Sequence, residues 1–309
     1  MDTTGFDDAF GTYNGAQVIY DMSAKAYHSD ADGPRLSQSL ATMCVTQSPL
    51  HAWQSHALLG GSPYRYTPNS DDGTIIHSLM LEPDSADIEE IDPATIKTKD
   101  GKPSKSPFAT EKGKRVRDDA LTAGRIPILT EALGAYRYKA KAFVQRLAAH
   151  ASPVEFTGKS EVVIYWQEET PSGVIRCRAR LDHLIVTPDE LLIIDVKTCG
   201  SAHPNQLKSQ VWKMAYDIQD AAYRRAVTAA FPEYAGRVRI VFAFCELDKP
   251  WAVNPITLNG EFRALGEARW TRGRDLWAKC LNSDDWTSYG GGDLAPPPWA
   301  MTEEMGENL

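Results

Sequence analysis

The sequence predicts an α/β domain in which helices flank a mixed β-sheet. Residues 176–186 and 191–197 are rich in apolar and β-branched residues, and the turn-forming residues TPDE lie between them, which predicts a β-hairpin. A helical pattern over residues 205–231 separates this hairpin from a further apolar strand at residues 237–246. Helical patterns also precede the hairpin, so we expect helical additions on the N-terminal side of the sheet.

Length and composition are those of a globular chain. The 309 residues are 42% hydrophobic, which is enough for a substantial core. We expect one domain over residues 27–293, interrupted by a Lys-rich loop at about residues 97–110. Residues 1–26 carry no clear periodicity and are expected to form a flexible N-terminal arm. The Pro-rich acidic tail at residues 294–309 is expected to be disordered.

Several classes of protein are disfavoured. No run of 18 apolar residues occurs, and the acidic N-terminus lacks the apolar run of a signal peptide, so we expect a cytoplasmic protein that does not bind membranes. The five cysteines are scattered without a CxxC pair, which argues against a disulfide framework or a zinc site. The sequence also lacks a phosphate-binding GxxxxGK[ST] loop, so an ATP-driven motor is disfavoured.

Helices are expected ahead of the hairpin. The first pattern covers residues 37–53 and is broken at Ser48–Pro49, where a second helix should begin. Residues 72–83 form another helix with an apolar stripe, and this helix carries His77. A lone histidine on such a helix is more often a packed residue than a ligand.

A strip of positive charge lies within this otherwise acidic chain. The net charge of −8 counts against a protein that coats nucleic acid. However, residues 97–146 hold 13 Lys and Arg against 5 Asp and Glu. The helical patterns at residues 111–123 and 130–150 lie in this strip, which we interpret as facing DNA; a solvated helix face is the alternative. The candidate DNA contacts on it are Lys112, Lys114 and Arg115.

The hairpin brings two acids together. With a four-residue turn, Val186 pairs with Leu191, and counting back along both strands places Asp182 opposite Asp195. Like charges in this arrangement are destabilising, and Asp195 ends an apolar run that we expect to be buried. Lys197 lies two residues further on and shares a face of the strand with Asp195. Two carboxylates and one ammonium group are therefore expected to converge.

This convergence has two interpretations. Oxygen ligands without His or Cys suit a hard cation such as Mg²⁺ or Mn²⁺, which can activate water and neutralise charge on a phosphate. Lys197 would then orient that water or stabilise the transition state. The alternative is an ordinary salt bridge in which Lys197 neutralises one aspartate across the strands. The spacing alone does not decide between them.

Arginines are expected on the same face as the acids. Arg178 and Arg180 share the parity of Asp182 along the strand, so alternation places all three on one face. Guanidinium groups at this position could clamp a phosphate backbone. Charge balance with Glu168 and Glu169 is the alternative.

Two flanking segments complete the expected surroundings of the acids. Residues 161–167 alternate and are rich in β-branched and aromatic residues, which predicts a strand beside the hairpin. The helix predicted at residues 205–231 carries three side chains at spacings of 3 and 4, which places them on one face. These side chains are Tyr216, Gln219 and Tyr223.

The hairpin motif resembles that of the PD-(D/E)xK nuclease superfamily. In that motif an Asp is followed, after a short gap, by an apolar residue, Asp, any residue and Lys. It is matched here by Leu181-Asp182 and Ile194-Asp195-Val196-Lys197. Leu181 stands where the superfamily name has Pro; this position supplies no metal ligand, so we expect activity to be retained. Further blocks between His28 and Tyr289 are similar to RecE-type exonucleases, the exodeoxyribonuclease VIII-like catalytic domains related to lambda exonuclease and RecB-type nuclease domains. These blocks are GTIIHSLMLEP, YDIQDAAY and WTSY.

The resemblance implies roles for individual residues. It implies an Mg²⁺ site, with Mn²⁺ able to substitute, held by Asp182, Asp195 and the carbonyl group of Val196. It also implies that His77 and Glu161 lie at this site and could be ligands. The remaining residues expected at the active site or on the DNA backbone are Lys197, Gln219, Tyr223 and Tyr216.

The resemblance implies a metal-dependent exonuclease that digests linear double-stranded DNA from its ends in the 5′→3′ direction. A role in phage-type recombination or DNA end processing would place it in a bacterial host cell. A ring-shaped trimer or tetramer and a single-strand annealing partner are implied as well. An endonuclease or Cas4-like end-processing enzyme of the same superfamily is an alternative, and a catalytically silent DNA-end-binding protein is another.

Overall fold

The structure, a computed structural model, describes residues 11–296 apart from Asn14, Asp21, Ala31 and residues 62–71, 85–86 and 98–99. The described residues form a seven-stranded sheet and a separate two-stranded sheet. In spatial order the strands of the large sheet are β1 (Gly11–Tyr13), β2 (Ala16–Ile19), β5 (Lys159–Thr170), β6 (Gly173–Val186), β7 (Leu191–Cys199), β8 (Val238–Glu246) and β9 (Val253–Ile256). Neighbouring strands are antiparallel except β7 and β8, so the predicted mixed sheet is confirmed.

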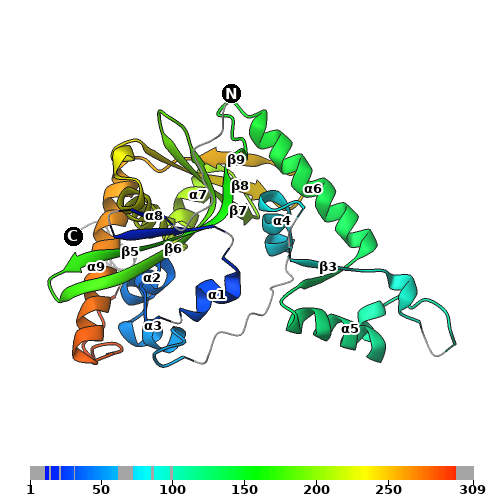
Figure 1. The fold of residues 1–309 in the computed structure, drawn as a ribbon, viewed down its shortest axis with the longest axis horizontal. Coiled ribbons are helices and arrows are strands. Elements are labelled where there is room, and N and C mark those ends of the chain that lie inside the picture. The colour runs from blue at the N-terminus through cyan, green and yellow to red at the C-terminus, as the bar shows by residue number, and fades with distance from the viewer. Residues whose placement is uncertain are drawn as a thin grey trace.

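Helices cover both faces of the sheet (Figure 1). Side chains alternate along β7, so Leu191 and Ile193 enter one core while Ile194 and Val196 enter the other. This burial on both faces explains the continuous apolar run in the sequence. The first core includes α2 (Gln38–Thr46), α3 (Pro49–Ser55), α8 (Tyr216–Ala230) and α9 (Gly260–Ser283), and the second includes α4 (Asp72–Leu81) and α6 (Thr130–Ala148).

The parallel pair β7 and β8 is joined by a helical crossover, which is broken in the middle. The prediction of one helix over residues 205–231 is therefore wrong. Ala215 adopts a left-handed conformation with φ of 55°, so α7 (Pro204–Lys213) ends before it and α8 begins after it. An alanine gives no sequence signal for this break, because glycine is the residue that usually occupies such a conformation.

The N-terminal region joins the sheet. Strand β2 pairs with β5, and Ala16 and Val18 are buried there. Helix α1 (Ala24–Ser29) follows and buries Tyr27. The prediction of a flexible arm over residues 1–26 is therefore wrong for this part, because a four-residue strand is too short to show a clear alternation. Residues 1–10 lie outside the described residues, as does the predicted tail from Pro297 onward.

A small unit projects from the second face of the sheet (Figure 1). It contains the parallel strands β3 (Ile88–Ile91) and β4 (Ile126–Leu129), two short 3-10 turns (Pro93–Thr95 and Pro107–Ala109), and α5 (Glu111–Thr122). The sequence analysis predicts α5 and the loop before it but misses both strands, which are only four residues long. None of the described helices is long and apolar enough to cross a membrane.

Candidate active site

The two aspartates lie where β6 and β7 separate. The ladder runs from Val186 opposite Leu191 to His183 opposite Ile194, which confirms the predicted turn and register. One position further on, the Asp182 Oδ2 atom accepts a hydrogen bond of 2.8 Å from the backbone N–H of Val196. A hydrogen bond from the backbone to the Asp182 side chain thus replaces the backbone hydrogen bonds between the strands at this point. The separation of the strands leaves space for a ligand beside the two carboxylates.

Asp195 is the buried centre of the cluster. Its side chain has no exposed surface, and its Oδ1 atom lies 2.5 Å from Nζ of Lys197. Its Oδ2 atom accepts a hydrogen bond of 2.6 Å from Nε2 of Gln219. The predicted convergence of Asp195 and Lys197 on one face of the strand is confirmed, while the catalytic role of this pair stays a prediction.

Helix α8 fixes the orientation of Asp195. Gln219 and Tyr223 are one turn apart, and the Gln219 amide also donates a 2.8 Å hydrogen bond to the Tyr223 hydroxyl group. That hydroxyl group donates in turn to the carbonyl of Arg180, at 2.8 Å. Tyr216 begins the same helix, and its ring centroid lies 4.7 Å from Nζ of Lys197. The break at Ala215 therefore starts α8 beside the lysine.

His77 on α4 is a charge partner of Asp182. Its Nε2 atom lies 2.9 Å from Oδ2 of Asp182. Burial disfavours the charged imidazolium, but the Asp182 carboxylate outweighs burial and raises the pKa of His77 to about 9. In this arrangement His77 is protonated and donates to Asp182. Metal ligation by His77, which would need the neutral ring, stays a prediction.

Glu161 lies opposite Asp182 in a distorted stretch of β5. Its φ of 56° is in the left-handed region, and this conformation costs a residue other than glycine about 1–2 kcal/mol. The flanking pairs Ser160–His183 and Val162–Leu181 stay in register, so the distortion is confined to Glu161. Its carboxylate lies 2.5 Å from Nε of Arg180. Such strain is concentrated at functional sites.

Burial and a neighbouring carboxylate disfavour the charged forms of two acids in the cluster. Burial and the charge of Asp182 raise the pKa of Asp195 to about 6, although Lys197 opposes them. Burial, reinforced by Asp182 and opposed by Arg180, raises the pKa of Glu161 to about 7. Burial also acts on Asp182, but His77 and Lys197 outweigh it, so the pKa of Asp182 is lowered. A further cation would stabilise the charged forms of Asp195 and Glu161 and lower the pKa of each.

The donor set fits a hard divalent cation. Apart from Nζ of Lys197 at 2.5 Å, the buried Oδ1 atom of Asp195 meets no hydrogen-bond donor among the described residues. In the described part of the chain, no three His, Cys, Asp or Glu side chains are already arranged as a metal cage. Mg²⁺ rarely uses such a cage, because it keeps several water ligands and binds one or two carboxylates. Asp182 and Asp195 supply those two carboxylates.

A pocket of about 360 Å³ opens onto the cluster. Its walls include His77, Glu161, Asp182 and Arg180, and it extends to the segment that precedes and begins α2. The sequence analysis did not assign this second wall, because it comes from residues far away in the sequence. The wall residues it missed include Tyr27, His28, Ser37, Gln38 and Ser39. The Ser-rich start of the helix was the only signal that could have pointed to them.

Arg178 holds α1 against the sheet. Its side chain is only 7% exposed, lies 3.7 Å from Asp30, and donates from Nη1 to the carbonyl of Tyr27. Asp30 is itself held by His56 at 3.1 Å and by the backbone N–H of Arg35 at 2.7 Å. Arg178 therefore shapes the pocket wall in this structure, and DNA binding by Arg178 or Arg180 stays a prediction.

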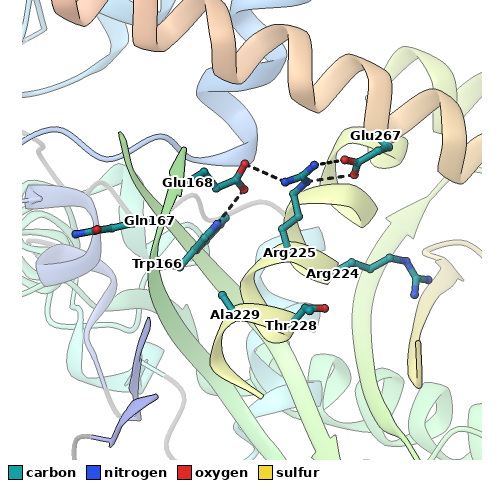
Figure 2. A pocket seen from close by; sticks show the side chains of 8 residues that line it. All are labelled: Trp166, Gln167, Glu168, Arg224, Arg225, Thr228, Ala229 and Glu267. Carbon is teal, nitrogen blue, oxygen red and sulfur yellow. Dashed lines mark hydrogen bonds and ion pairs between the residues drawn. The ribbon is translucent and has the colours of Figure 1, made fainter. Parts of the chain in front are cut away.

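A second pocket, of about 420 Å³, lies between β5, α8 and α9 (Figure 2). Glu168 accepts hydrogen bonds there from the indole N–H of Trp166, at 3.0 Å, and from Arg225, at 3.1 Å. It also accepts from Trp270 and Arg274. The alternative in which Glu168 balances Arg178 and Arg180 is thus wrong. Glu168 and Glu267 in this pocket form ion pairs with Arg225, which is typical of a structural role.

The predicted DNA-facing lysines lie on the projecting unit, apart from the aspartates (Figure 1). Lys112 donates to the carbonyl of Thr95 at 2.8 Å, and Lys114 forms an ion pair with Glu111 at 3.0 Å. Arg115 is exposed. These residues do not join the acidic cluster, and their contact with DNA stays a prediction.

A mixed sheet with helices on both faces, and an Asp and an Asp-x-Lys at separating strands, define a domain of the PD-(D/E)xK nuclease superfamily. The model of one family, described as a PDDEXK-like domain of unknown function (DUF3799), matches residues 128–293, which is more than half of the chain. The chain belongs to this family. The match leaves out α1, α2 and α4, so the pocket wall and His77 lie outside it.

Solved structures include two similar proteins. A candidate exonuclease from Eubacterium rectale has 14% sequence identity and a TM-score of 0.48, covering 93% of this chain and 100% of its own. The protein SSO0001 has 14% identity and a TM-score of 0.26, covering 63% of this chain and 83% of its own. None of the curated proteins matches the chain.

Proposed function

We propose that this protein is a metal-dependent deoxyribonuclease that digests linear double-stranded DNA from its ends. The observation that carries the proposal is the cluster of Asp182, Asp195 and Lys197, in which Gln219 orients Asp195 and Asp182 lines a pocket. A structural salt bridge needs one acid and one base. It does not need a second buried carboxylate and an oriented amide beside them.

The residues that would hold Mg²⁺ are Asp182, Asp195 and the carbonyl group of Val196. The chemistry that Mg²⁺ supplies at such a site is polarisation of a phosphoryl oxygen and activation of water. Gln219 and Tyr223 keep Asp195 in a fixed orientation, so little reorganisation is needed when a ligand arrives.

Lys197 supplies a hydrogen-bond donor and a positive charge at the site. Burial favours the neutral amine, but the carboxylates of Asp195 and Asp182 outweigh burial, and the pKa of Lys197 is raised. The ammonium group therefore donates a hydrogen bond to the attacking water or to the developing negative charge on the phosphate. This argues for stabilisation of the transition state rather than for abstraction of a proton.

The pocket supports a DNA strand as the ligand, because a phosphate group would meet Arg180 at its wall. We propose 5′→3′ digestion in phage-type recombination or end processing, by the resemblance to RecE-type enzymes. An oligomeric ring and a single-strand annealing partner are parts of the same proposal.

The test is digestion of linear duplex DNA, labelled at the 5′ end of one strand, beside closed circular DNA, with Mg²⁺ or with EDTA. We expect short labelled products from linear DNA only, and we expect EDTA or Lys197→Ala to abolish them. Lys279→Ala, which changes an exposed lysine on α9, is the matched control and should digest at the wild-type rate. Nicking of the circular DNA would instead indicate an endonuclease.

A further inference from the structure

An exposed indole lies on the helix next to the candidate active site. Trp212 is in the last turn of α7 and is 49% exposed, and Met214, just after the helix, is 59% exposed. Leu265 on α9 is 40% exposed. Large apolar side chains that gather at the surface of a soluble domain mark interaction sites more often than chance.

The indole is held rigidly. The guanidinium carbon of Arg269 lies 4.1 Å from the centroid of the Trp212 ring, in a cation–π contact. Arg269 donates in turn to both carboxylate oxygens of Asp217, each at 2.8 Å, and the Asp217 side chain is fully buried. The ring is thus fixed against the protein while about half of its surface stays in solvent. A surface prepared in this way loses little entropy when a flat ligand stacks on it.

The surroundings of Trp212 are basic. Lys208 is four residues before Trp212 on α7, so the two share a helix face, and the ten residues of α7 include no Asp or Glu. On α9, Arg269 and Arg272 follow Leu265 by one and two turns and share its face. Arg269 is paired with Asp217, and Glu261 lies one turn before Leu265 on α9. Lys208 and Arg272 therefore supply the positive charge near the indole that is complementary to a polyanion.

Helix α7 connects these residues to the candidate active site. Gln210 hydrogen-bonds the side chain of Tyr216, and the Tyr216 ring contacts Lys197. Gln210 and Trp212 are two residues apart and so lie on opposite sides of a helix that is about 10 Å across. A strand that passes over α7 would therefore reach Trp212 within a few nucleotides of the acids.

We infer that Trp212 and Leu265, with Lys208, Arg269 and Arg272, form a stacking platform for unpaired bases of a DNA strand. We call these five residues the Trp212 platform. The inference rests on the proposed function in taking DNA as the ligand, and it adds that a single-stranded stretch lies beside the cleavage site. Base stacking is tolerant of sequence, so the platform would bind any unpaired strand.

The test is binding of fluorescently labelled oligothymidine in EDTA, where a metal-dependent enzyme cannot cut. Removal of one stacking aromatic costs about 1–3 kcal/mol, so Trp212→Ala should weaken binding roughly 5- to 150-fold. Trp212→Phe should retain most of the affinity. Tyr138→Ala removes another exposed aromatic ring, on α6 and outside the platform, and should bind like the wild type. Lys208→Glu, at an exposed position on the same face of α7 as Trp212, should also weaken binding.

Unchanged binding in both Trp212→Ala and Lys208→Glu would overturn the platform, as would failure of the wild type to bind oligothymidine. A change of oligomeric state in Trp212→Ala, measured by light scattering together with the loss of binding, would also overturn it by showing a contact between copies of the chain. The binding assay needs no cleavage. Loss of binding in Trp212→Ala would therefore support the platform even if the nuclease assay failed.

Discussion

Gln219 positions the carboxylate of Asp195 in the candidate active site. Its amide group joins the Asp195 carboxylate to the Tyr223 hydroxyl group, which is anchored in turn on the carbonyl of Arg180. The helical spacing of Gln219 and Tyr223 was readable from the sequence. Their target was not, because the contact between α8 and β7 depends on the break at Ala215.

Gln219→Leu should keep the shape of the side chain while it removes the amide. Loss of a group that orients a metal ligand typically costs 10- to 100-fold in metal affinity or activity. We expect a loss of that size in the digestion rate, partly recovered at high Mg²⁺ concentration, in an assay that varies Mg²⁺. Gln145→Leu on the exposed face of α6 is the control. A wild-type rate and Mg²⁺ dependence in Gln219→Leu would contradict a positioning role.

The other contacts of the site also fall into two groups: those that the sequence predicts and those that it does not. The pairing of Asp195 with Lys197 follows from strand alternation, so the sequence predicts it. His77 pairs with Asp182, and Arg178 donates a hydrogen bond to the carbonyl of Tyr27. Each contact joins elements more than 100 residues apart in the sequence. No local pattern encodes these contacts.

At the scale of elements, His183 joins β6 to two neighbours. The backbone N–H of Gly158 donates to its Nε2 atom at 2.9 Å. The hydroxyl group of Ser160 donates to the carbonyl of Leu81 on α4, so its oxygen accepts from Nδ1 of His183 at 2.9 Å. These partners require the neutral ring with its proton on Nδ1, and burial lowers the pKa of His183 to about 4.

This arrangement predicts a loss of stability in acid. An unfolded histidine binds a proton near pH 6.5, whereas the folded one binds it only near pH 4, so the unfolded state holds more protons between these values. The contribution is fully present above pH 6.5 and is lost as the pH falls toward 4, by on the order of 3 kcal/mol. Urea unfolding at several pH values measures it. The stability difference between the wild type and His183→Gln should shrink from pH 7 to pH 4.

Gln145→Leu, which changes an exposed residue on α6 and no histidine, provides the control. Its unfolding free energy should follow the pH dependence of the wild type. A His183→Gln variant whose unfolding free energy runs parallel to that of the wild type from pH 7 to pH 4 would rule out a neutral, buried His183.

The elements themselves were predictable where a pattern was long. The hairpin of β6 and β7 was predicted with its register, because the turn residues fix the loop and the buried face fixes the alternation. The four-residue strands β2, β3 and β4 were missed, because their pairing depends on partners elsewhere in the chain. Because β2 was missed, residues 16–19 were expected to be part of a flexible arm, whereas they pair with β5 in the sheet.

At the scale of the whole molecule, the chain separates negative and positive regions. The net charge is −8, yet the cluster of acids opens into a pocket walled by Arg180, and α7 and α9 present basic residues beside it. A DNA strand would meet cations first and carboxylates only at the cleavage site. The match to the PDDEXK-like family covers strands β5 to β9 of the large sheet and the helices between and after them. Strands β1 and β2 and the pocket wall from α1 and α2 lie N-terminal to it.

The central claim is that Asp182 and Asp195 form the catalytic centre of a nuclease. The most direct test is mass spectrometry of the products released from linear duplex DNA by the wild type and by Asp195→Asn, with Mg²⁺ or Mn²⁺. We expect the wild type to release nucleotides that carry a 5′-phosphate and Asp195→Asn, which has nearly the same shape, to release none. Failure of the folded wild type to release nucleotides with either metal, or equal release by Asp195→Asn, would contradict the claim.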